Sequence, residues 1–305
     1  MKILITGING LIGEAIANFF LSRGYDVAGI GRTTHNSLSK KIRFYQLDLS
    51  EDYKNFSKVI DDYFDLVIHC AAQQPSEGVS IQAFYNSNIV ATSNLLSWMK
   101  NCGMNKIIHF STLAFLRFST NPSITHCESS PPQPSNAYTL SKASAEKIIL
   151  AFSKNEKFVS YCLRIPSLVH PKQKGGVVHS YFESAYKKKP IDLYDMGIMK
   201  RNLINTQSII QALDAIINIK EIPGFNLFNL GSKDSWNQMR IAEYFYKKLY
   251  NIEQIIPVNK TSSISGHWNI NLSKSESELD YKPWMIEKIL DDYLTVMLEH
   301  AKIEI

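Results

Sequence analysis

The first 24 residues constrain the fold of this chain more than any other stretch. Residues 2–6 form a short apolar run with β-branched side chains, which is typical of a buried strand. Glycines follow at positions 7, 10 and 13, and an amphipathic pattern typical of a helix then runs to a stop at Gly24. The stretch therefore predicts a strand, a tight glycine turn and a helix in immediate succession.

This glycine turn has the spacing that a phosphate-binding loop needs. The backbone can reverse within a few residues only where no Cβ restricts it, as at Gly7. Unpaired N–H groups at the helix start favour an anion, which a side chain at Gly10 would block, and a side chain at Gly13 would push the helix off the sheet. Three glycines also fit a simple tight turn, but the strand–turn–helix context favours a dinucleotide site. We expect cofactor contacts from Gly7, Asn9, Gly10, Leu11, Ile12 and Gly13.

Length and charge are compatible with a globular α/β protein. A chain of 305 residues can bury one large core and a smaller lobe. The net charge of +5 is modest and the lysines are scattered, so we expect no nucleic-acid partner. The triple lysine at 187–189 is expected to be a solvated helix end.

The cysteines indicate neither a metal site nor a redox motif. Cys70, Cys102, Cys127 and Cys162 show no metal-ligand spacing and no C-x-x-C pair. We expect them to be reduced thiols of a cytoplasmic protein. Met1 leads directly into the first strand, which predicts no signal peptide. No apolar run approaches the roughly 20 residues of a membrane span, so no membrane partner is expected.

The end of the second predicted strand, 26–31, bears on the choice of cofactor. Many NAD sites place a carboxylate here, where it binds the adenosine ribose. In this chain Gly31 and Arg32 occupy the position, and a guanidinium pairs well with a 2′-phosphate. The pattern favours NADP. The alternative is that Arg32 is an ordinary surface residue after a strand, which would leave NAD as the cofactor.

Strands and helices alternate through the first half of the chain. Further strands are predicted at 42–47, 65–72 and 106–111. A long helix is expected at 82–100. This alternation predicts a doubly wound parallel sheet, in which ligands lie off the carboxyl ends of the strands. At one such end, the small side chains of Ala71 and Ala72 would let a flat ring lie over the backbone.

Four polar residues indicate the reaction chemistry. Ser111 and Thr112 lie at the end of a strand, and Tyr138 and Lys142 share one face of a predicted helix because they are four residues apart. The lysine ammonium is expected to lower the pKa of the Tyr138 phenol and make it a better acid and base. Thr112 would hold the substrate oxygen in line with Tyr138. Because a lone Y-x-x-x-K is usually two surface residues of a helix, this interpretation depends on the other motifs.

Together these motifs resemble those of the extended short-chain dehydrogenase/reductases, the NAD(P)-dependent epimerase/dehydratase group that mostly acts on nucleotide sugars. The matching stretches are Thr6 to Gly13, Asp48, His69 to Ala72, Asn88 to Leu96, Ser111-Thr112, Tyr138 to Lys142, Leu163 to Pro166, Arg201 to Asn205 and Lys282-Pro283. The resemblance implies a Rossmann-like α/β fold with a smaller C-terminal substrate lobe. The dinucleotide-binding domain would span 1–165 plus about 201–231, and the substrate-binding lobe about 166–200 plus 232–305.

The resemblance also implies roles for single residues. Thr112, Tyr138 and Lys142 would be catalytic. Asp48 would hold the adenine amine and Pro166 would lie near the nicotinamide. Further cofactor contacts would come from Arg32, Leu49, Ala71, Ala72, Asn88, Ser111, Tyr138 and Lys142. Arg201 would meet the substrate diphosphate, and the substrate site would also include Gln73, Thr112 and Ser167.

Departures from the family pattern reduce the number of reactions that this chain is expected to catalyse. The 4,6-dehydratases follow the catalytic threonine with Asp-Glu, whereas Leu113 and Ala114 stand here and cannot move a proton. Elimination of water is therefore not expected. No cysteine occurs at 113–118, which argues against epimerisation at carbons 3 and 5. No arginine occurs at 261–274, where many members place a second phosphate contact.

Two enzyme functions stay open at this point. One is an NADPH-dependent 4-ketoreductase acting on a nucleotide-activated deoxysugar, and the other is an NAD-dependent nucleotide-sugar 4-epimerase. A small non-nucleotide carbonyl substrate is a further alternative. The presence of Thr112, Tyr138 and Lys142 together argues against a non-catalytic, cofactor-sensing protein. Apolar and small side chains on helices 82–100 and 138–153 predict a homodimer.

Overall fold

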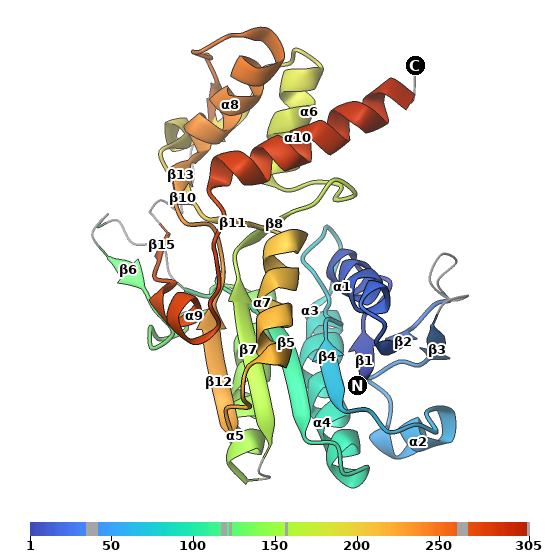
Figure 1. Ribbon diagram of the computed structural model, residues 1–305. Helices are drawn as coiled ribbons and strands as arrows, with labels where there is room; N and C mark the ends of the chain where they lie inside the picture. Colours follow the sequence, from blue (N-terminus) through green and yellow to red (C-terminus); the bar gives the residue numbers. More distant parts are fainter. Residues whose placement is uncertain (35–41, 117–120, 122–123, 156–157, 261–267, 304–305) are drawn as a thin grey trace. The chain divides into compact units, whose positions relative to one another are not determined.

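The computed structural model divides into two compact units (Figure 1). It describes residues 1–34, 42–116, 121, 124–155, 158–260 and 268–303. The first unit comprises Met1–Leu116, Pro131–Arg164 and Ile216–Phe228. The second comprises Arg117–Ser130, Ile165–Ala215 and Asn229–Ile305. Residues 201–215, which the sequence boundary placed with the dinucleotide-binding domain, group with the second unit.

The first unit is built on a seven-stranded sheet with the order β12-β7-β5-β4-β1-β2-β3. Its strands are β1 (Lys2–Thr6), β2 (Asp26–Gly31), β3 (Arg43–Gln46), β4 (Leu66–His69), β5 (Lys106–Thr112), β7 (Val159–Ile165) and β12 (Gly224–Asn229). The strands from β3 through β2, β1 and β4 to β5 pair in parallel. The doubly wound sheet is therefore confirmed. β12 joins its edge beside β7 although the two strands are far apart in the sequence.

Helices flank this sheet and bury their apolar faces against it. They are α1 (Leu11–Ser22), α2 (Phe56–Val59, after a 3₁₀ turn at Tyr53–Asn55), α3 (Ile81–Phe84), α4 (Ala91–Asn101) and α5 (Ala137–Asn155). α1 turns its buried residues Ile16, Ala17 and Phe20 inward. It ends where predicted, because Gly24 has a φ of +77° and its N–H donates to the carbonyl of Leu21.

The long helix expected at 82–100 contains a change of helix type. Between α3 and α4, residues Tyr85–Val90 form a π-helical segment. Its one buried residue is the polar Asn88. A π segment inside an α-helix shifts the following side chains around the helix axis and often occurs at functional sites. Sequence periodicity predicts the helix but not this insertion.

The second unit contains short strand pairs and a helical layer. Its strands are β6 (Thr125–His126), β8 (Ser167–Val169), β9 (Asp192–Tyr194), β10 (Lys200–Arg201), β11 (Leu203–Asn205), β13 (Trp236–Asn237), β14 (Val258–Lys260) and β15 (Asn269–Ile270). Its helices are α6 (Val177–Tyr186), α8 (Gln238–Tyr250), α9 (Ser273–Glu278) and α10 (Ile286–Ile303), with a 3₁₀ turn at Asp195–Gly197; α7 (Thr206–Asn218) begins here. Phe182, Phe245 and Tyr293 pack edge to face in its core.

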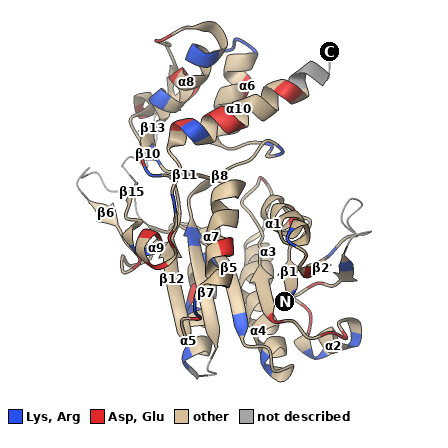
Figure 2. Cartoon of the chain, in the orientation of Figure 1, with Lys and Arg blue, Asp and Glu red and all other residues tan. Residues whose placement is uncertain are grey.

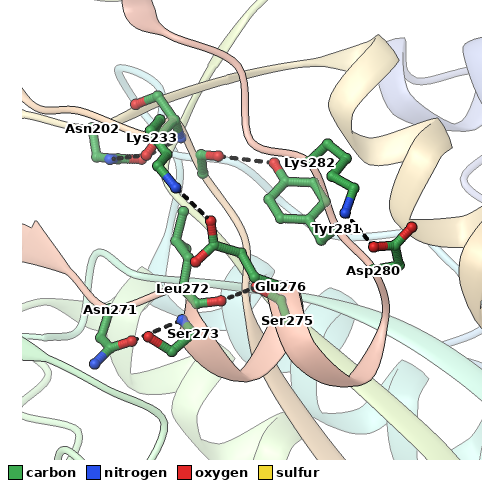
Figure 3. A network of polar contacts seen from close by, with 12 residues as sticks. Asn202, Lys233, Asn271, Leu272, Ser273, Ser275, Glu276, Asp280, Tyr281 and Lys282 are labelled. Atoms are coloured by element: carbon green, nitrogen blue, oxygen red, sulfur yellow. Dashed lines mark hydrogen bonds and ion pairs between the residues drawn. The ribbon is translucent and has the colours of Figure 1, made fainter.

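Polar contacts around α9 hold the C-terminal part of the second unit together (Figure 3). Tyr281 is buried and its hydroxyl donates to the carbonyl of Gly231 at 2.8 Å. Lys233 forms a 2.8 Å ion pair with Glu276 on α9. Asn202 donates to the carbonyl of Ser232 at 2.9 Å. Segments from three parts of the sequence therefore meet here.

Charged side chains of both signs are interspersed along α8 and α10 (Figure 2). Such mixing is typical of solvated helix faces. Within the described residues, no helix is both long and apolar enough to cross a membrane.

Candidate active site

The glycine turn in the first unit is shaped by close backbone approach. Gly7 has a φ of +65°, and a Cβ built on it would lie 2.6 Å from the backbone nitrogen of Ala71. A Cβ on Gly13 would lie 2.8 Å from the Cα of Ile8. Gly10 caps α1 without any side-chain hydrogen bond. The first N–H groups of α1 are thus left without a side-chain cap, which fits a bound phosphate.

Asn9 ties this turn to the end of β2. Its Nδ2 donates to the carbonyl of Thr33 at 2.6 Å, while its buried Oδ1 has no hydrogen-bond partner among the described residues. A Cβ on Gly31 would lie 3.0 Å from that Nδ2. Packing against Asn9 is therefore one reason why position 31 carries no acid. Arg32 is exposed beside it, and no described carboxylate pairs with its guanidinium.

Asp48 follows β3 and is half-buried. Its Oδ1 accepts hydrogen bonds from the backbone nitrogen of Ser50 at 2.9 Å and from the Ser50 hydroxyl at 2.8 Å. Leu49 beside it is buried. One carboxylate oxygen of Asp48 thus shapes its own turn, so only the other would be available for an adenine amine.

The carboxyl ends of β1 and β4 meet at Ala71. Its backbone nitrogen donates to the Thr6 hydroxyl at 3.2 Å, and Ala71 and Ala72 are both half-buried. The same Thr6 hydroxyl lies 2.7 Å from Nδ1 of His69. Ala71 therefore lies directly beside the glycine turn, as ligand binding at this sheet edge requires.

Asn88, expected to contact the cofactor, has its side chain occupied within the protein. Its Oδ1 accepts from the backbone nitrogen of Gln73 at 2.7 Å. Its Nδ2 donates to the carbonyl of Gln73 at 3.2 Å and to the hydroxyl of Ser141 at 2.8 Å. Asn88 therefore connects the loop after β4 to the helix that carries Tyr138.

Thr112 lies near enough to Tyr138 for its side chain to act on the pKa of the Tyr138 phenol, in the direction that lowers it. Thr112 is buried at the end of β5, and the preceding Ser111 has a buried hydroxyl without a hydrogen-bond partner among the described residues. Tyr138 lies in the first turn of α5, where Asn136 accepts from the backbone nitrogen of Thr139 at 2.9 Å and so caps the helix. The strand end and the helix start thus bring the two hydroxyls together.

The expected depression of the Tyr138 pKa is wrong for this structure. Burial raises the pKa of the phenol, and hydrogen bonds from Thr112 and Gln74 lower it only in part. Lys142 is not among the groups that act on it. The physical reason is that the ammonium is directed to β5: Lys142 Nζ donates to the carbonyl of Phe110 at 2.6 Å.

Burial lowers the pKa of Lys142 to about 8, although Cys162, Glu146 and Cys70 act in the opposite direction. Lys142 is 3% exposed. An ammonium in such surroundings loses hydration, which disfavours its charged form. Lys142 is therefore a cation that can release its proton near neutral pH, unlike a surface lysine.

Sequence reasoning missed two residues of this site. The side chain of Gln74 lies where it lowers the pKa of the Tyr138 phenol, whereas only its neighbour Gln73 was expected at the substrate. His109 on β5 lies with its Nε2 3.4 Å from Lys142 Nζ. The sequence signal that could have identified His109 is its position as a polar residue within the apolar run of strand 106–111.

The remaining expected site residues belong to the second unit. Pro166 is buried and Ser167 begins β8 with an exposed side chain. Arg201 is half-buried, its guanidinium lies 5.9 Å from the ring centroid of Trp268, and burial lowers its pKa. The stretch 261–274 contains no arginine that could provide a second phosphate contact, and residues 261–267 of it lie outside the described residues.

Comparison with known proteins identifies the class. The model of the NAD dependent epimerase/dehydratase family matches residues 3–231, and the chain belongs to this family. The resemblance stated from the motifs is confirmed, and with it membership of an enzyme family of sugar-nucleotide epimerases and dehydratases.

Individual relatives are distant. The chain is 24% identical over 246 residues to a UDP-glucuronate 4-epimerase of Thermodesulfobacterium geofontis, covering 75% of this chain and 74% of that protein. It is 27% identical over 275 residues to a dTDP-D-glucose 4,6-dehydratase of Dictyostelium discoideum, covering 82% of this chain and 62% of that protein. These relatives therefore leave the particular reaction open.

A solved structure supports the fold. The UDP-glucuronic acid 4-epimerase from Bacillus cereus, in complex with UDP-glucuronic acid and NAD, aligns with a TM-score of 0.81 and 23% identity. The alignment covers 97% of this chain and 100% of that one. At this identity the likeness establishes the Rossmann-like architecture and no more.

Proposed function

We propose that this protein is an NADPH-dependent 4-ketoreductase that acts on a nucleotide-activated deoxysugar. The observation that carries the proposal is that the end of β5 places Thr112 near Tyr138, where its side chain lowers the pKa of the phenol, with Lys142 one turn further along α5. Two hydroxyls near a helix that also carries a buried lysine one turn further along are suited to general acid–base chemistry at a carbonyl oxygen.

In this proposal the reduced cofactor supplies the hydride when it is bound. Tyr138 gives its phenolic proton to the substrate oxygen, so that a ketone becomes a secondary alcohol. Thr112 donates to the same oxygen and holds it in line. The side chains of Leu113 and Ala114 have no acidic or basic group that could transfer a proton, which disfavours the dehydratase reaction of some relatives.

The choice of NADPH depends on the end of β2. Arg32 is exposed there without a paired carboxylate among the described residues, and Gly31 leaves no acid to repel a phosphate. A guanidinium binds a phosphate through two parallel hydrogen bonds. We assign the cofactor to the first unit, through the glycine turn, Asp48 and the β4 end. We assign the sugar nucleotide to the second unit, with Arg201 at its diphosphate and Ser167 at its sugar.

An NAD-dependent 4-epimerase is the second candidate. The observation in its favour is the likeness to a UDP-glucuronate 4-epimerase over three quarters of the chain. An epimerase oxidises and re-reduces one carbon with the same acid–base residues, so the geometry around Tyr138 serves both reactions. The difference lies in the cofactor, which an epimerase regenerates in every cycle and gains by retaining.

Mass spectrometry of the purified protein under native conditions separates the two functions. We expect little retained NAD, and oxidation of NADPH when a 4-keto-6-deoxy sugar nucleotide is added. Stoichiometric NAD, no preference for NADPH and interconversion of two UDP-sugars would instead establish the epimerase.

A further inference from the structure

Lys142 has two acceptors on β5, and one of them is a histidine. Its Nζ donates to the Phe110 carbonyl at 2.6 Å and lies 3.4 Å from Nε2 of His109. His109 is 1% exposed and Lys142 is 3% exposed. Water therefore does not compete for this contact.

The ring of His109 rests against a second ring that is fixed on both sides. His69 and His109 are paired across β4 and β5, and their ring centroids lie 5.2 Å apart. His69 Nδ1 is 2.7 Å from the Thr6 hydroxyl, and its Nε2 is 3.0 Å from the Thr92 hydroxyl. His69 thus provides a rigid surface for the ring of His109.

The contact with Lys142 determines the tautomer of His109. An ammonium only donates, so Nε2 must accept and Nδ1 must carry the proton. Nδ1 is buried and has no hydrogen-bond partner among the described residues. Buried polar groups without partners are rare and call for an explanation. The contact with Lys142 is the one polar interaction that the described residues offer this side chain.

We propose that His109 is a positioning residue for Lys142. Together with the Phe110 carbonyl it occupies two of the three N–H bonds of the ammonium. The direction of the third bond is then fixed by tetrahedral geometry. This inference rests on the proposed role of Lys142 beside Tyr138, but the contact itself is measurable without any substrate.

The other groups around Lys142 do little to stabilise its charged form, so the imidazole of His109 matters for the protonation of Lys142. Glu146 lies one turn further on α5, but it is paired with Arg164, with Nη2 and Oε2 2.9 Å apart. Burial raises the pKa of the Cys162 and Cys70 thiols, so both are neutral. His69 is neutral as well, since burial lowers its pKa to about 3. A neutral imidazole that accepts from the ammonium stabilises the charged form of Lys142.

Two substitutions at His109 separate this contact from packing. His109→Phe keeps a ring against His69 but removes the acceptor. His109→Gln keeps a side-chain oxygen that can accept from Lys142. The probe is the ¹³Cε resonance of Lys142 in protein labelled at the lysine ε-carbons, assigned with Lys142→Arg and titrated with pH.

We expect a midpoint of about 8 in the unaltered protein. The midpoint should fall by about 0.5 to 1 unit in His109→Phe and stay within about 0.2 units in His109→Gln. Equal midpoints in all three proteins would overturn the proposal. If His109→Phe does not fold, His109→Leu replaces it.

Turnover supplies a second readout. The alkaline limb of the pH profile of kcat should move to lower pH in His109→Phe, because the lysine ammonium deprotonates at a lower pH in that variant. In His109→Gln the limb should lie where it lies in the unaltered protein. A uniform loss of kcat without any shift of the limb would indicate a purely structural role and contradict the proposal. The NMR titration stays decisive if the assigned reaction proves wrong, because it uses the protein alone.

Discussion

Asn88 Nδ2 donates to the hydroxyl of Ser141 at 2.8 Å, which joins the π-helical segment to the helix that carries Tyr138 and Lys142. Ser141 in turn donates to the carbonyl of Tyr138 at 2.7 Å. Asn88 also holds both backbone groups of Gln73. The segment therefore fixes two parts of the candidate site relative to one another.

A double-mutant cycle tests this connection. Asn88→Ala removes the donor to the buried Ser141 hydroxyl and leaves both backbone groups of Gln73 without their Asn88 partner, so it should lower the free energy of unfolding by about 1–3 kcal/mol. Ser141→Ala should cost less, and the pair should couple by about 0.5–1.5 kcal/mol. Urea denaturation of the four proteins measures both values. Additive effects would contradict a direct contact.

Tyr138→Phe should lower turnover by about 100-fold or more and leave cofactor affinity unchanged. The change removes only the phenolic hydroxyl, whose pKa the Thr112 side chain lowers. Steady-state kinetics and a fluorescence titration with NADPH measure the two effects. Tyr85→Phe, at an exposed position of the π segment, is the matched control. If the variant turned over substrate at nearly the rate of the unaltered protein, Tyr138 would not be a catalytic acid or base.

Arg32→Ala should weaken NADPH roughly 10- to 100-fold and leave NADH nearly unchanged. A charge-assisted contact to the 2′-phosphate contributes about 1.5–3 kcal/mol. Calorimetric titration with each cofactor measures both affinities, and Arg23→Ala, at the residue directly after α1, serves as a control for lost surface charge. Equal losses for both cofactors would mean that Arg32 does not distinguish them.

We expect a homodimer through the helices around the site. Ile81, Tyr85 and Leu140 are 76%, 50% and 56% exposed, and α3 and the π segment pack beside α5. Four small residues of α5 were expected to allow close approach; Ser141, Ala143 and Ala145 are buried within the chain, and Ser144 is half-buried. Light scattering should give twice the chain mass, and Leu140→Asp should give a monomer. Tyr63→Asp, equally exposed elsewhere, should remain a dimer; a monomeric unaltered protein contradicts the expectation.

The free energy of unfolding should depend on pH because of the buried ring of His69. Burial lowers its pKa from 6.5 to about 3, so the unfolded chain binds the proton first as pH falls. Stability contributed by the neutral ring is present above pH 6.5 and is lost towards pH 3, by about 1.4 kcal/mol per pH unit. The difference in unfolding free energy between the unaltered protein and His69→Gln should shrink accordingly from pH 7 to pH 4. A constant difference would show that His69 does not titrate in this window.

The local elements of the first unit could be predicted from the sequence. β1 and β2 have the predicted bounds, and Gly7 and Gly24 take the positive φ values expected of them. These features depend on residues close together in the chain: apolar runs, glycine freedom and caps. The family motifs extend the prediction to the whole fold, since each motif occupies a fixed place in the order of strands.

The partners of the polar groups were decided only by the tertiary structure. Helical spacing placed Lys142 beside Tyr138, but the folded chain directs its Nζ to Phe110 and His109, more than 30 residues away in sequence. The insertion at Tyr85–Val90 and the role of Asn88 as a connector also have no local signal. Sequence periodicity fixes which face of a helix is apolar. Which acceptor a buried ammonium finds depends on strand order and on competition among all groups within reach.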